Sequence, residues 1–419
     1  MRYLFALLLC TQFAVAQKKN LQFQNAAYEE NIRTVRLGAP GIPMNNNPPA
    51  SVASIFQQDL VLTFDDIQEG KNSYYARLIH CTADWRKSTL NDLDFLAIYN
   101  EFNVTDYDYS SNTHLPYIHY RFPLPQVKLP GNYLLVVYRD SDRNDIVLTM
   151  RFMIYQHRVN IITDNVNTGS LALSSTNQQL NFLINYKDIE VFNPMDNFQV
   201  VIRQNQRWDN ARFDVKPSFI REDIRQLEYR FFDQSNYWMA GNEYRFVDFR
   251  SLNSPGQNTG RLDRLVQPNE LSVRMDIPRK DQAYAQYRDL NGGYLVENLD
   301  YRGDPNGSSQ YLFVDFSLRS ELLPDATVYV CGLFNHWART EENKMTYDKK
   351  TSTYKASLVL KQGWYDYEYI VDSPSLPLTY FEGSHFETEN LYEILVYYRS
   401  LKPMTDLLVG YYPIPINPR

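Results

Sequence analysis

The sequence predicts an all-β protein built of immunoglobulin-like β-sandwich domains in tandem. Short stretches of alternating apolar and polar residues recur at regular spacing, and few stretches have helical periodicity. Aromatic residues make up 15% of the 419 residues, and large rings pack well on a pleated, half-buried surface. Only 16 residues are glycine, which argues against glycine-rich phosphate loops. The formal net charge of −7 offers no basic excess for nonspecific nucleic-acid binding.

Residues 1–16 have the features of a secretory signal peptide. Arg2 supplies a positive start, an apolar stretch follows, and Ala14-Val15-Ala16 is a small-residue cleavage site before Gln17. Cys10 could be a lipid anchor, but the residue before it, Leu9, is not small, so we expect a cleaved and unlipidated product. No other stretch approaches the ~20 apolar residues of a membrane-spanning helix.

The first predicted domain, residues 17–157, begins with an extended lead to Ser54 that carries several prolines. Its alternating segments predict strands at Asp59–Asp65, Tyr74–Trp85, Tyr117–Phe122, Asn132–Arg139 and Ile146–Tyr155. We expect the last two strands to pair as a hairpin through the polar turn Asp140–Asp145, which mimics the start of a calcium loop but lacks its glycine and closing glutamate.

Two more domains and a tail follow. The second domain, residues 158–305, has predicted strands at Gln179–Tyr186, Phe198–Gln204, Gln226–Phe232, Glu243–Phe249, Leu271–Met275 and Gly293–Val296. The third, residues 306–400, has predicted strands at Gln310–Leu318, Ala326–Gly332, Thr353–Leu360, Trp364–Asp372 and Leu391–Arg399. Residues 401–419 are expected to form a proline-bearing tail.

The sequence offers no catalytic constellation. A zinc site needs clustered ligands, and only His114 and His119 come close; their spacing of five places them on opposite faces of a strand. No nucleophile elbow, Cys–His signature or zincin motif is present. Cys81 and Cys331 are best interpreted as two buried thiols, although a disulfide is permitted in an oxidising compartment. We therefore expect a protein that is not an enzyme and that has no metal and no cofactor.

Residues 328–337 and 363–372 resemble the early-set immunoglobulin-like domains that serve as glycogen-binding modules. The resemblance implies that Trp337 occupies the place of a tryptophan that stacks on sugar rings. The second sugar-stacking tryptophan of that family is absent, and Glu368 stands where that family has a lysine. Packing or interface contact is therefore the preferred role of Trp337, and an exported glycan-binding accessory protein stays as the alternative function.

A second resemblance covers nearly the whole mature chain. The chain resembles the plug protein of the type IX secretion system in the motifs His80-Cys81-Thr82-Ala83-Asp84-Trp85, Ser111-Asn112-Thr113-His114, His119-Tyr120-Arg121, Gly131–Tyr138, Met150–Met153, Asp289-Leu290-Asn291-Gly292, Gly383–Asn390 and Leu408–Tyr411. The resemblance implies a non-enzymatic periplasmic protein that docks on the outer-membrane translocon barrel and closes its periplasmic mouth in the resting state.

Aromatic side chains provide large contact areas at low entropic cost, which makes them candidates for such a docking surface. The candidate partner-binding residues are Trp85, Tyr107, Tyr109, His114 and Trp337. The expected partner is the barrel protein, with carbohydrate as the alternative and no nucleic acid.

Overall fold

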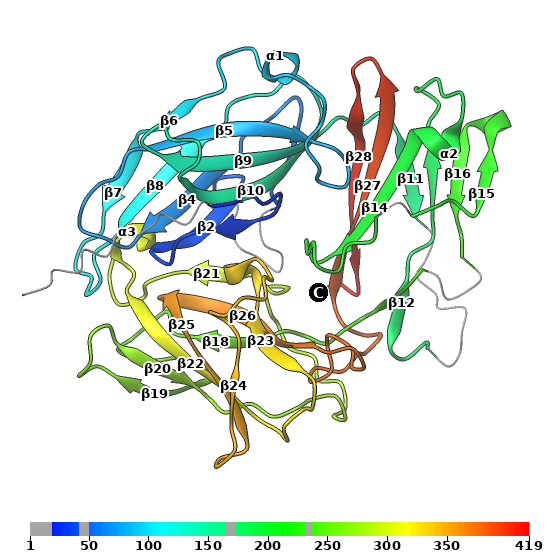
Figure 1. Cartoon of the computed structure of the whole chain (residues 1–419). Coiled ribbons are helices and arrows are strands. Elements are labelled where there is room, and N and C mark those ends of the chain that lie inside the picture. The colour runs from blue at the N-terminus through cyan, green and yellow to red at the C-terminus, as the bar shows by residue number, and fades with distance from the viewer. Residues whose placement is uncertain (1–18, 42–49, 164–172, 214, 232–235, 419) are drawn as a thin grey trace, which may run out of the picture.

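The computed structural model describes residues 19–41, 50–163, 173–213, 215–231 and 236–418, so the predicted signal peptide and Cys10 lie outside the described residues. Within these ranges the chain forms 28 strands, and its three α-helices are four residues each: α1 (Asp92–Phe95), α2 (Pro194–Asn197) and α3 (Pro305–Ser308). The predicted all-β class is confirmed. The strands form three sandwich-like bodies arranged around a common centre (Figure 1).

The first body packs two sheets face to face. One sheet has the order β1-β10-β9-β5-β6, with β3 also paired to β10, and its strands are β1 (Ala26–Ala27), β3 (Val52–Ser54), β5 (Tyr74–Cys81), β6 (Phe102–Val104), β9 (Gly131–Arg139) and β10 (Ile146–Tyr155). The other has the order β2-β4-β8-β7, with strands β2 (Ile32–Gly38), β4 (Val61–Asp66), β7 (Asp106–Tyr109) and β8 (Ile118–Pro123). The predicted β9–β10 hairpin is confirmed by its antiparallel register.

The second body is built from two separate parts of the sequence, and the third body is formed by the residues between them. Its sheets are β11-β13-β16-β15, β12-β17 and β14-β27-β28. Their strands are β11 (Asn160–Thr163), β12 (Asn177–Gln179), β13 (Phe182–Asn185), β14 (Phe198–Gln204), β15 (Phe219–Arg221), β16 (Gln226–Tyr229), β17 (Tyr237–Met239), β27 (Asn390–Leu401) and β28 (Met404–Ile416). The C-terminal hairpin thus completes a sheet begun almost two hundred residues earlier, beside β14 (Figure 1).

The third body lies between these two ends in the sequence. Its sheets are β18-β26-β21, with β23 also paired to β26, and β19-β20-β22-β25-β24. Their strands are β18 (Arg245–Asp248), β19 (Thr259–Asp263), β20 (Glu270–Val273), β21 (Tyr294–Val296), β22 (Tyr311–Arg319), β23 (Thr327–Cys331), β24 (Thr346–Asp348), β25 (Thr353–Lys361) and β26 (Gly363–Asp372). Most ladders are antiparallel, but β20 and β22 pair in parallel.

The expected tail at residues 401–419 is wrong, because β28 occupies most of it. Pro413 and Pro415 interrupt the apolar alternation, which is why the segment looked like a tail. Both prolines lie on an edge strand, where a missing N–H is tolerated. Leu408 and Val409 of the same strand are fully buried. The sequential division of residues 17–400 into domains stays a prediction; the hydrophobic cores combine residues 159–238 with 392–416, and collect residues 247–381 separately.

Two further features bear on class and chemistry. Cys81 and Cys331 are both buried and free. No helix in the described ranges is long and apolar enough to cross a membrane.

Candidate functional site

Two predicted docking residues lie together on the edge strand β7 of the first body. Among the described strands, β7 pairs only with β8. The rings of Tyr107 and Tyr109 pack edge to face with their centroids 5.8 Å apart. Tyr109 is 58% exposed, whereas Tyr107 is half-buried, with Lys71 Nζ 4.4 Å from its ring centroid. This edge presents an aromatic ring that a partner can contact.

His114 lies in the loop between β7 and β8, and this loop packs on the third body. Its side chain is exposed, and its backbone N–H donates to Oε1 of Gln310 at 2.9 Å. The backbone N–H of Ser111 donates to the carbonyl of Gly307 in α3, also at 2.9 Å. The loop that carries His114 therefore forms a contact within the molecule, next to the β7 edge.

Trp85 lies in an apolar junction between the first body and the β14-β27-β28 sheet. Its side chain is 2% exposed and meets the ring of Trp208 edge to face at 5.0 Å. The Arg151 guanidinium covers the Trp85 ring at 4.6 Å from its centroid. Leu395 and Leu408 of the second body are fully buried in the same cluster. In this conformation Trp85 is a packing residue with no free face for a partner. We call this contact between the first body and the β14-β27-β28 sheet the apolar junction.

Trp337 is also buried, at 5% exposure, next to Tyr244. The guanidinium carbon of Arg207 lies 3.9 Å from the Trp337 ring centroid, and Arg207 Nη1 donates to Glu368 Oε1 at 2.5 Å. A Cβ on Gly292 would lie only 2.5 Å from the Trp337 ring. No sugar can stack on a ring covered in this way, so the structure does not favour the glycan-binding alternative.

A charged junction between the first and third bodies was not found from the sequence. Asp65 on β4 and Lys361 on β25 are both fully buried, and Lys361 Nζ donates to Asp65 Oδ2 at 2.6 Å. The Tyr311 hydroxyl donates to the same oxygen at 2.6 Å, and His119 Nδ1 lies 2.6 Å from Oδ1. Burial opposes ionisation of Asp65, but Lys361 and His119 outweigh burial and lower its pKa. We call this group the polar junction.

Little in the sequence could have revealed the polar junction. Asp65 and Lys361 are 296 positions apart, and each stands in a strand whose alternation is otherwise ordinary. Asp65 lies on the same face of its predicted strand as Val61 and Thr63, opposite to Leu62 and Phe64, so the alternation gave no sign that this carboxylate is buried and paired. His119, considered above as a metal ligand, belongs to this junction.

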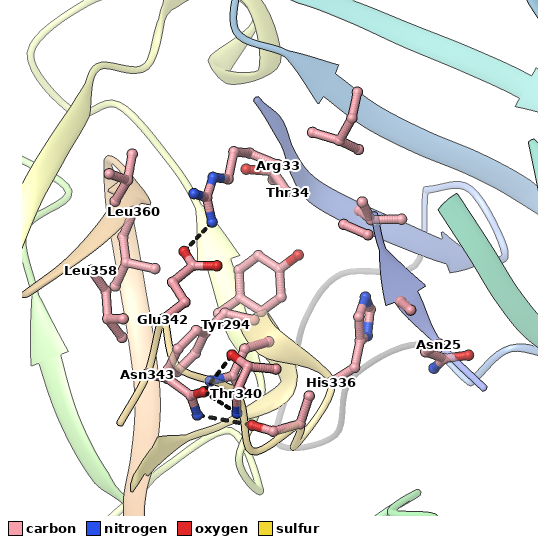
Figure 2. Close-up of a pocket in the computed structure, with 18 of the residues that line it drawn as sticks. Asn25, Arg33, Thr34, Tyr294, His336, Thr340, Glu342, Asn343, Leu358 and Leu360 are labelled. Carbon is pink, nitrogen blue, oxygen red and sulfur yellow. Dashed lines mark hydrogen bonds and ion pairs between the residues drawn. The ribbon is translucent and has the colours of Figure 1, made fainter. Parts of the chain in front are cut away.

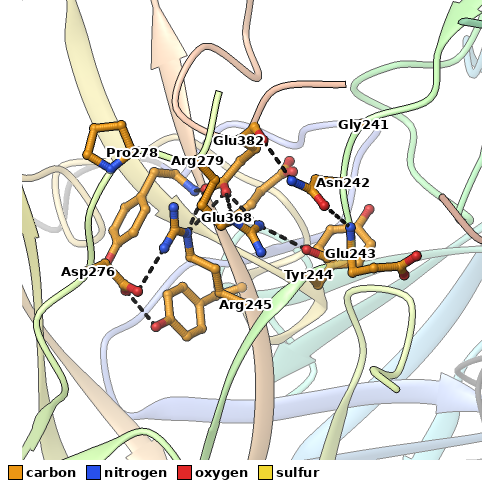
Figure 3. Close-up of polar contacts among 12 residues, drawn as sticks. Gly241, Asn242, Glu243, Tyr244, Arg245, Asp276, Pro278, Arg279, Glu368 and Glu382 are labelled. Carbon is orange, nitrogen blue, oxygen red and sulfur yellow. Dashed lines mark hydrogen bonds and ion pairs between the residues drawn. The ribbon is translucent and has the colours of Figure 1, made fainter. Parts of the chain in front are cut away.

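A second charged cluster holds the loops of the third body together (Figure 3). Glu382 accepts from Arg245 Nε at 3.0 Å and from Arg279 Nη2 at 2.6 Å, and its Oε1 accepts from the backbone N–H of Tyr369. Arg245 Nη1 also donates to Asp276 at 2.8 Å. Burial opposes ionisation of Glu382, but the two guanidinium groups prevail and lower its pKa to about 2. These contacts tie residues 276–279 and 382 to strands β18 and β26.

Two buried carboxylates fix the turn Asp289–Gly292. Asp289 accepts from the backbone N–H of Tyr244 at 2.5 Å, and Asp366 accepts from the backbone N–H of Leu290 at 2.5 Å. Burial raises the pKa of Asp289 to about 7, and the neighbouring Glu243 adds to the effect. Burial, followed by the charge of Asp289, also raises the pKa of Asp366. Gly292 of this turn packs against the Trp337 ring. By fixing the turn, the two acids therefore have a structural role.

A cavity of about 280 Å³ lies between β2 of the first body and loops of the third (Figure 2). Arg33 and Glu342 form an ion pair at its wall. Asn343 Oδ1 accepts from the backbone N–H of Thr340 at 2.9 Å, which orders the loop that carries Glu342. Among the described residues, no group of three or more His, Cys, Asp or Glu side chains is placed to hold a metal ion.

Comparison with known proteins identifies a family that the first body resembles. Residues 32–156, which form most of the first body, match the family model described as the first domain of the type 9 secretion system plug protein. The first body is thus similar to the first domain of a type 9 secretion system plug protein. The plug family is not an enzyme family.

Solved structures extend the comparison to the whole fold. A crystal structure of a hypothetical protein from Parabacteroides merdae is 26% identical and covers 95% of this chain and 100% of that chain, with a TM-score of 0.87. A structure of manganese lipoxygenase from Gaeumannomyces graminis with part of zonadhesin from Komagataella pastoris aligns over 93% of this chain and 94% of that chain, at 7% identity and a TM-score of 0.14, and bears on neither fold nor function. No curated protein matches the chain.

Proposed function

We propose that this protein is a non-enzymatic periplasmic plug that binds the type IX translocon barrel and closes its periplasmic opening in the resting state. The observation that carries the proposal is the match of residues 32–156 to the first domain of the plug protein. The signal peptide would direct export and be cleaved after Ala16, and the mature protein would stay at the inner face of the outer membrane.

The internal contacts support a plug that keeps one shape. The first body is joined to the third by the polar junction and to the second by the apolar junction. A closure that must block a wide opening benefits from bodies held together by buried contacts, because the junctions oppose relative motion of the bodies.

The exposed edge of the first body offers a docking surface. Tyr109 on β7 is 58% exposed, so its ring can serve as an aromatic anchor. Arg121, opposite Asp106 on the neighbouring strand, pairs with Asp106 and Asp108 and gives the edge a polar rim. We propose that Tyr107, Tyr109 and His114 contact the barrel from this edge; the buried rings of Trp85 and Trp337 are not part of the proposed surface.

Channel recording tests closure directly. The purified barrel is reconstituted in a planar bilayer, and the mature chain is added to its periplasmic side. We expect conductance to fall with wild-type protein, and we expect Tyr109→Ala to require at least about tenfold more protein, because the aromatic anchors that dominate an interface contribute about 2 kcal/mol or more. Leu265→Ala, at a side chain of the third body that is 95% exposed, is the matched control.

Two outcomes have different meanings. Unchanged conductance at saturating wild-type protein, together with no copurification of the barrel, would contradict the proposed function. If Tyr109→Ala closes the barrel as efficiently as the wild type, the plug function stands, but the β7 edge is not its docking surface. Sequencing the N-terminus of the periplasmic protein tests cleavage before Gln17.

A further inference from the structure

A second cavity, of about 370 Å³, adjoins the cavity of Figure 2 and lies where the three bodies meet. The two cavities share the wall residues Asn25, Val35, Tyr294 and His336. The first body contributes strands β2 and β10, the second contributes residues 203–208, and the third contributes residues near 294 and 333. Its volume is within the range of sites that bind small organic ligands, roughly 300–1,000 Å³.

The wall of this cavity carries positive charge without a matching negative charge. Arg36, Arg121, Arg151 and Arg203 line it, and no Asp or Glu is among its described lining residues. Arg121 pairs with acids on β7, and Arg203 Nη2 donates to Glu393 at 2.9 Å. Neither Arg36 nor Arg151 has a carboxylate of the described residues within ion-pair distance. Two guanidinium groups are therefore available to an anion.

Of Arg36 and Arg151, Arg151 is the better placed to bind an anion. Its Nε donates to the backbone carbonyl of Phe23 at 2.8 Å, and its guanidinium lies between two rings, 4.6 Å from the Trp85 centroid and 5.4 Å from that of Trp208. Burial, reinforced by the positive charge of Arg203, lowers the pKa of Arg151 to about 10, so the group is still charged at neutral pH. A largely buried and unpaired charge costs free energy that a bound anion recovers.

The rest of the wall favours a ligand whose remaining part is apolar. Val35, Leu37, Leu295 and Leu333 also line the cavity and favour an apolar group. All residues of β2 from Val35 to Gly38 line it, on both faces of the strand, so the strand presents its edge to the cavity. This edge has no neighbouring strand among the described residues, because β2 pairs only with β4, and such an edge can add an extended peptide.

We propose that this cavity binds a carboxylate attached to an apolar body, with Arg151 and Arg36 holding the carboxylate and the β2 edge and apolar wall holding the rest. The carboxylate can belong to the acidic end of an extended peptide or to a free organic acid. The proposal does not rest on the plug function, and Arg36, Arg151 and the β2 edge, which would hold the ligand, are not part of the proposed docking surface on β7.

Titration of the full mature chain, followed by calorimetry and by tryptophan fluorescence, tests the proposal. The probes are the peptide N-acetyl-Leu-Phe-Val with a free carboxylate, the same peptide as its amide, and 4-phenylbutyrate. We expect the peptide acid to bind at least about tenfold more tightly than the amide, as a hydrogen bond to a charged group allows. The emission of Trp85 and Trp208 should change with it. Binding of phenylbutyrate but not of the peptide acid would support the carboxylate site and assign it to a free acid.

Variants then locate the binding. Arg151→Gln should weaken binding of the acid at least about tenfold, the loss of one charged hydrogen-bonding partner. Arg86→Gln, at a side chain on the Trp85 turn that is 79% exposed, should leave it unchanged. The comparison of acid with amide on wild type needs no variant and stands even if Arg151→Gln fails to fold. Equal affinity for acid and amide, failure of both acids to bind, or binding unaffected by a folded Arg151→Gln would overturn the proposal.

Discussion

The first body meets its two neighbours through junctions of opposite chemistry. Toward the third body the contact is charged and hydrogen-bonded, with Asp65 at its centre and Lys361 and Tyr311 reaching it from the other side. Toward the second body it is apolar, with Leu395 and Leu408 packed against strands of the first body. Figure 1 shows the first body in contact with both neighbours. One body is thus held by two physically different contacts.

The difference has consequences for orientation and for strength. Apolar contact is non-directional, and its stabilisation follows the area removed from water, about 25 cal/mol per Å². A buried ion pair adds little net stability over an apolar replacement, but it tolerates only one arrangement, because an unpaired buried charge is costly. We infer that the apolar junction holds the bodies together, while the polar junction fixes the angle between the first and third bodies.

The largest expected effect comes from breaking the polar junction on one side. Lys361→Met leaves the Asp65 carboxylate buried with its main counter-charge removed, so the free energy of unfolding should fall by about 3–5 kcal/mol. Urea denaturation followed by tryptophan fluorescence measures this loss. Lys355→Met, on the same strand at a half-exposed ion pair, is the matched control and should leave the midpoint nearly unchanged. A loss as small as that of the control would show that the ion pair does not constrain the junction.

A cavity at the apolar junction should cost slightly less. Leu395 is fully buried, and Leu395→Ala is expected to lower the free energy of unfolding by about 2–5 kcal/mol through lost burial and the cavity left behind. Leu401→Ala in the same strand, at a side chain that is 81% exposed, should change it very little. The same denaturation experiment applies, and equal effects of the two variants would refute the packing role assigned to Leu395.

Acid should loosen the polar junction selectively. Because the folded pKa of Asp65 lies below its unfolded value of about 3.9, its contribution is complete above that value and is lost as pH falls through the folded pKa. The effect should be smaller than that of Lys361→Met, since Tyr311 stays in place. Hydrogen exchange of residues 110–117 and 305–311, followed in steps downward from pH 7 and corrected for intrinsic rates, should accelerate as the pH falls through the folded pKa of Asp65, while β27 and β28 stay protected. Unchanged protection of the first two segments would contradict this account.

The sequence predicted what depends on local pattern. Alternation located β9 and β10 and their turn, and short strands at regular spacing together with the aromatic content indicated the all-β class. Pairing between strands far apart in the sequence could not be predicted in this way. The sheet β14-β27-β28 combines distant segments, and the two prolines of β28 interrupt the alternation that would have identified it as a strand.

Exposure was equally hard to predict for single residues. Trp85 and Trp337 follow strand ends as surface anchors would, but each has left-handed backbone, with φ of 63° and 62°, and is covered by an arginine from elsewhere in the chain. Arg151 covers Trp85 from β10 of the same body, and Arg207 covers Trp337 from the second body, so only the folded chain identifies these contacts. The same limit hid the arginine-lined cavity, whose wall comes from all three bodies.

The smallest effects come from one substitution made at both junctions. Tyr311 donates its hydroxyl to ionised Asp65 at 2.6 Å, whereas Tyr397 donates to the neutral amide oxygen of Asn132 at 2.8 Å, and both side chains are 1% exposed. A hydrogen bond to a charged group contributes about 1.5–3 kcal/mol, and a neutral one about 0.5–1.5 kcal/mol. Tyr311→Phe should therefore destabilise the protein more than Tyr397→Phe in urea denaturation at pH 7. Lowering the pH below the folded pKa of Asp65 should bring the two losses together, because Asp65 then becomes neutral. If Tyr397→Phe is the more damaging variant at pH 7, the charge on Asp65 does not distinguish the two junctions.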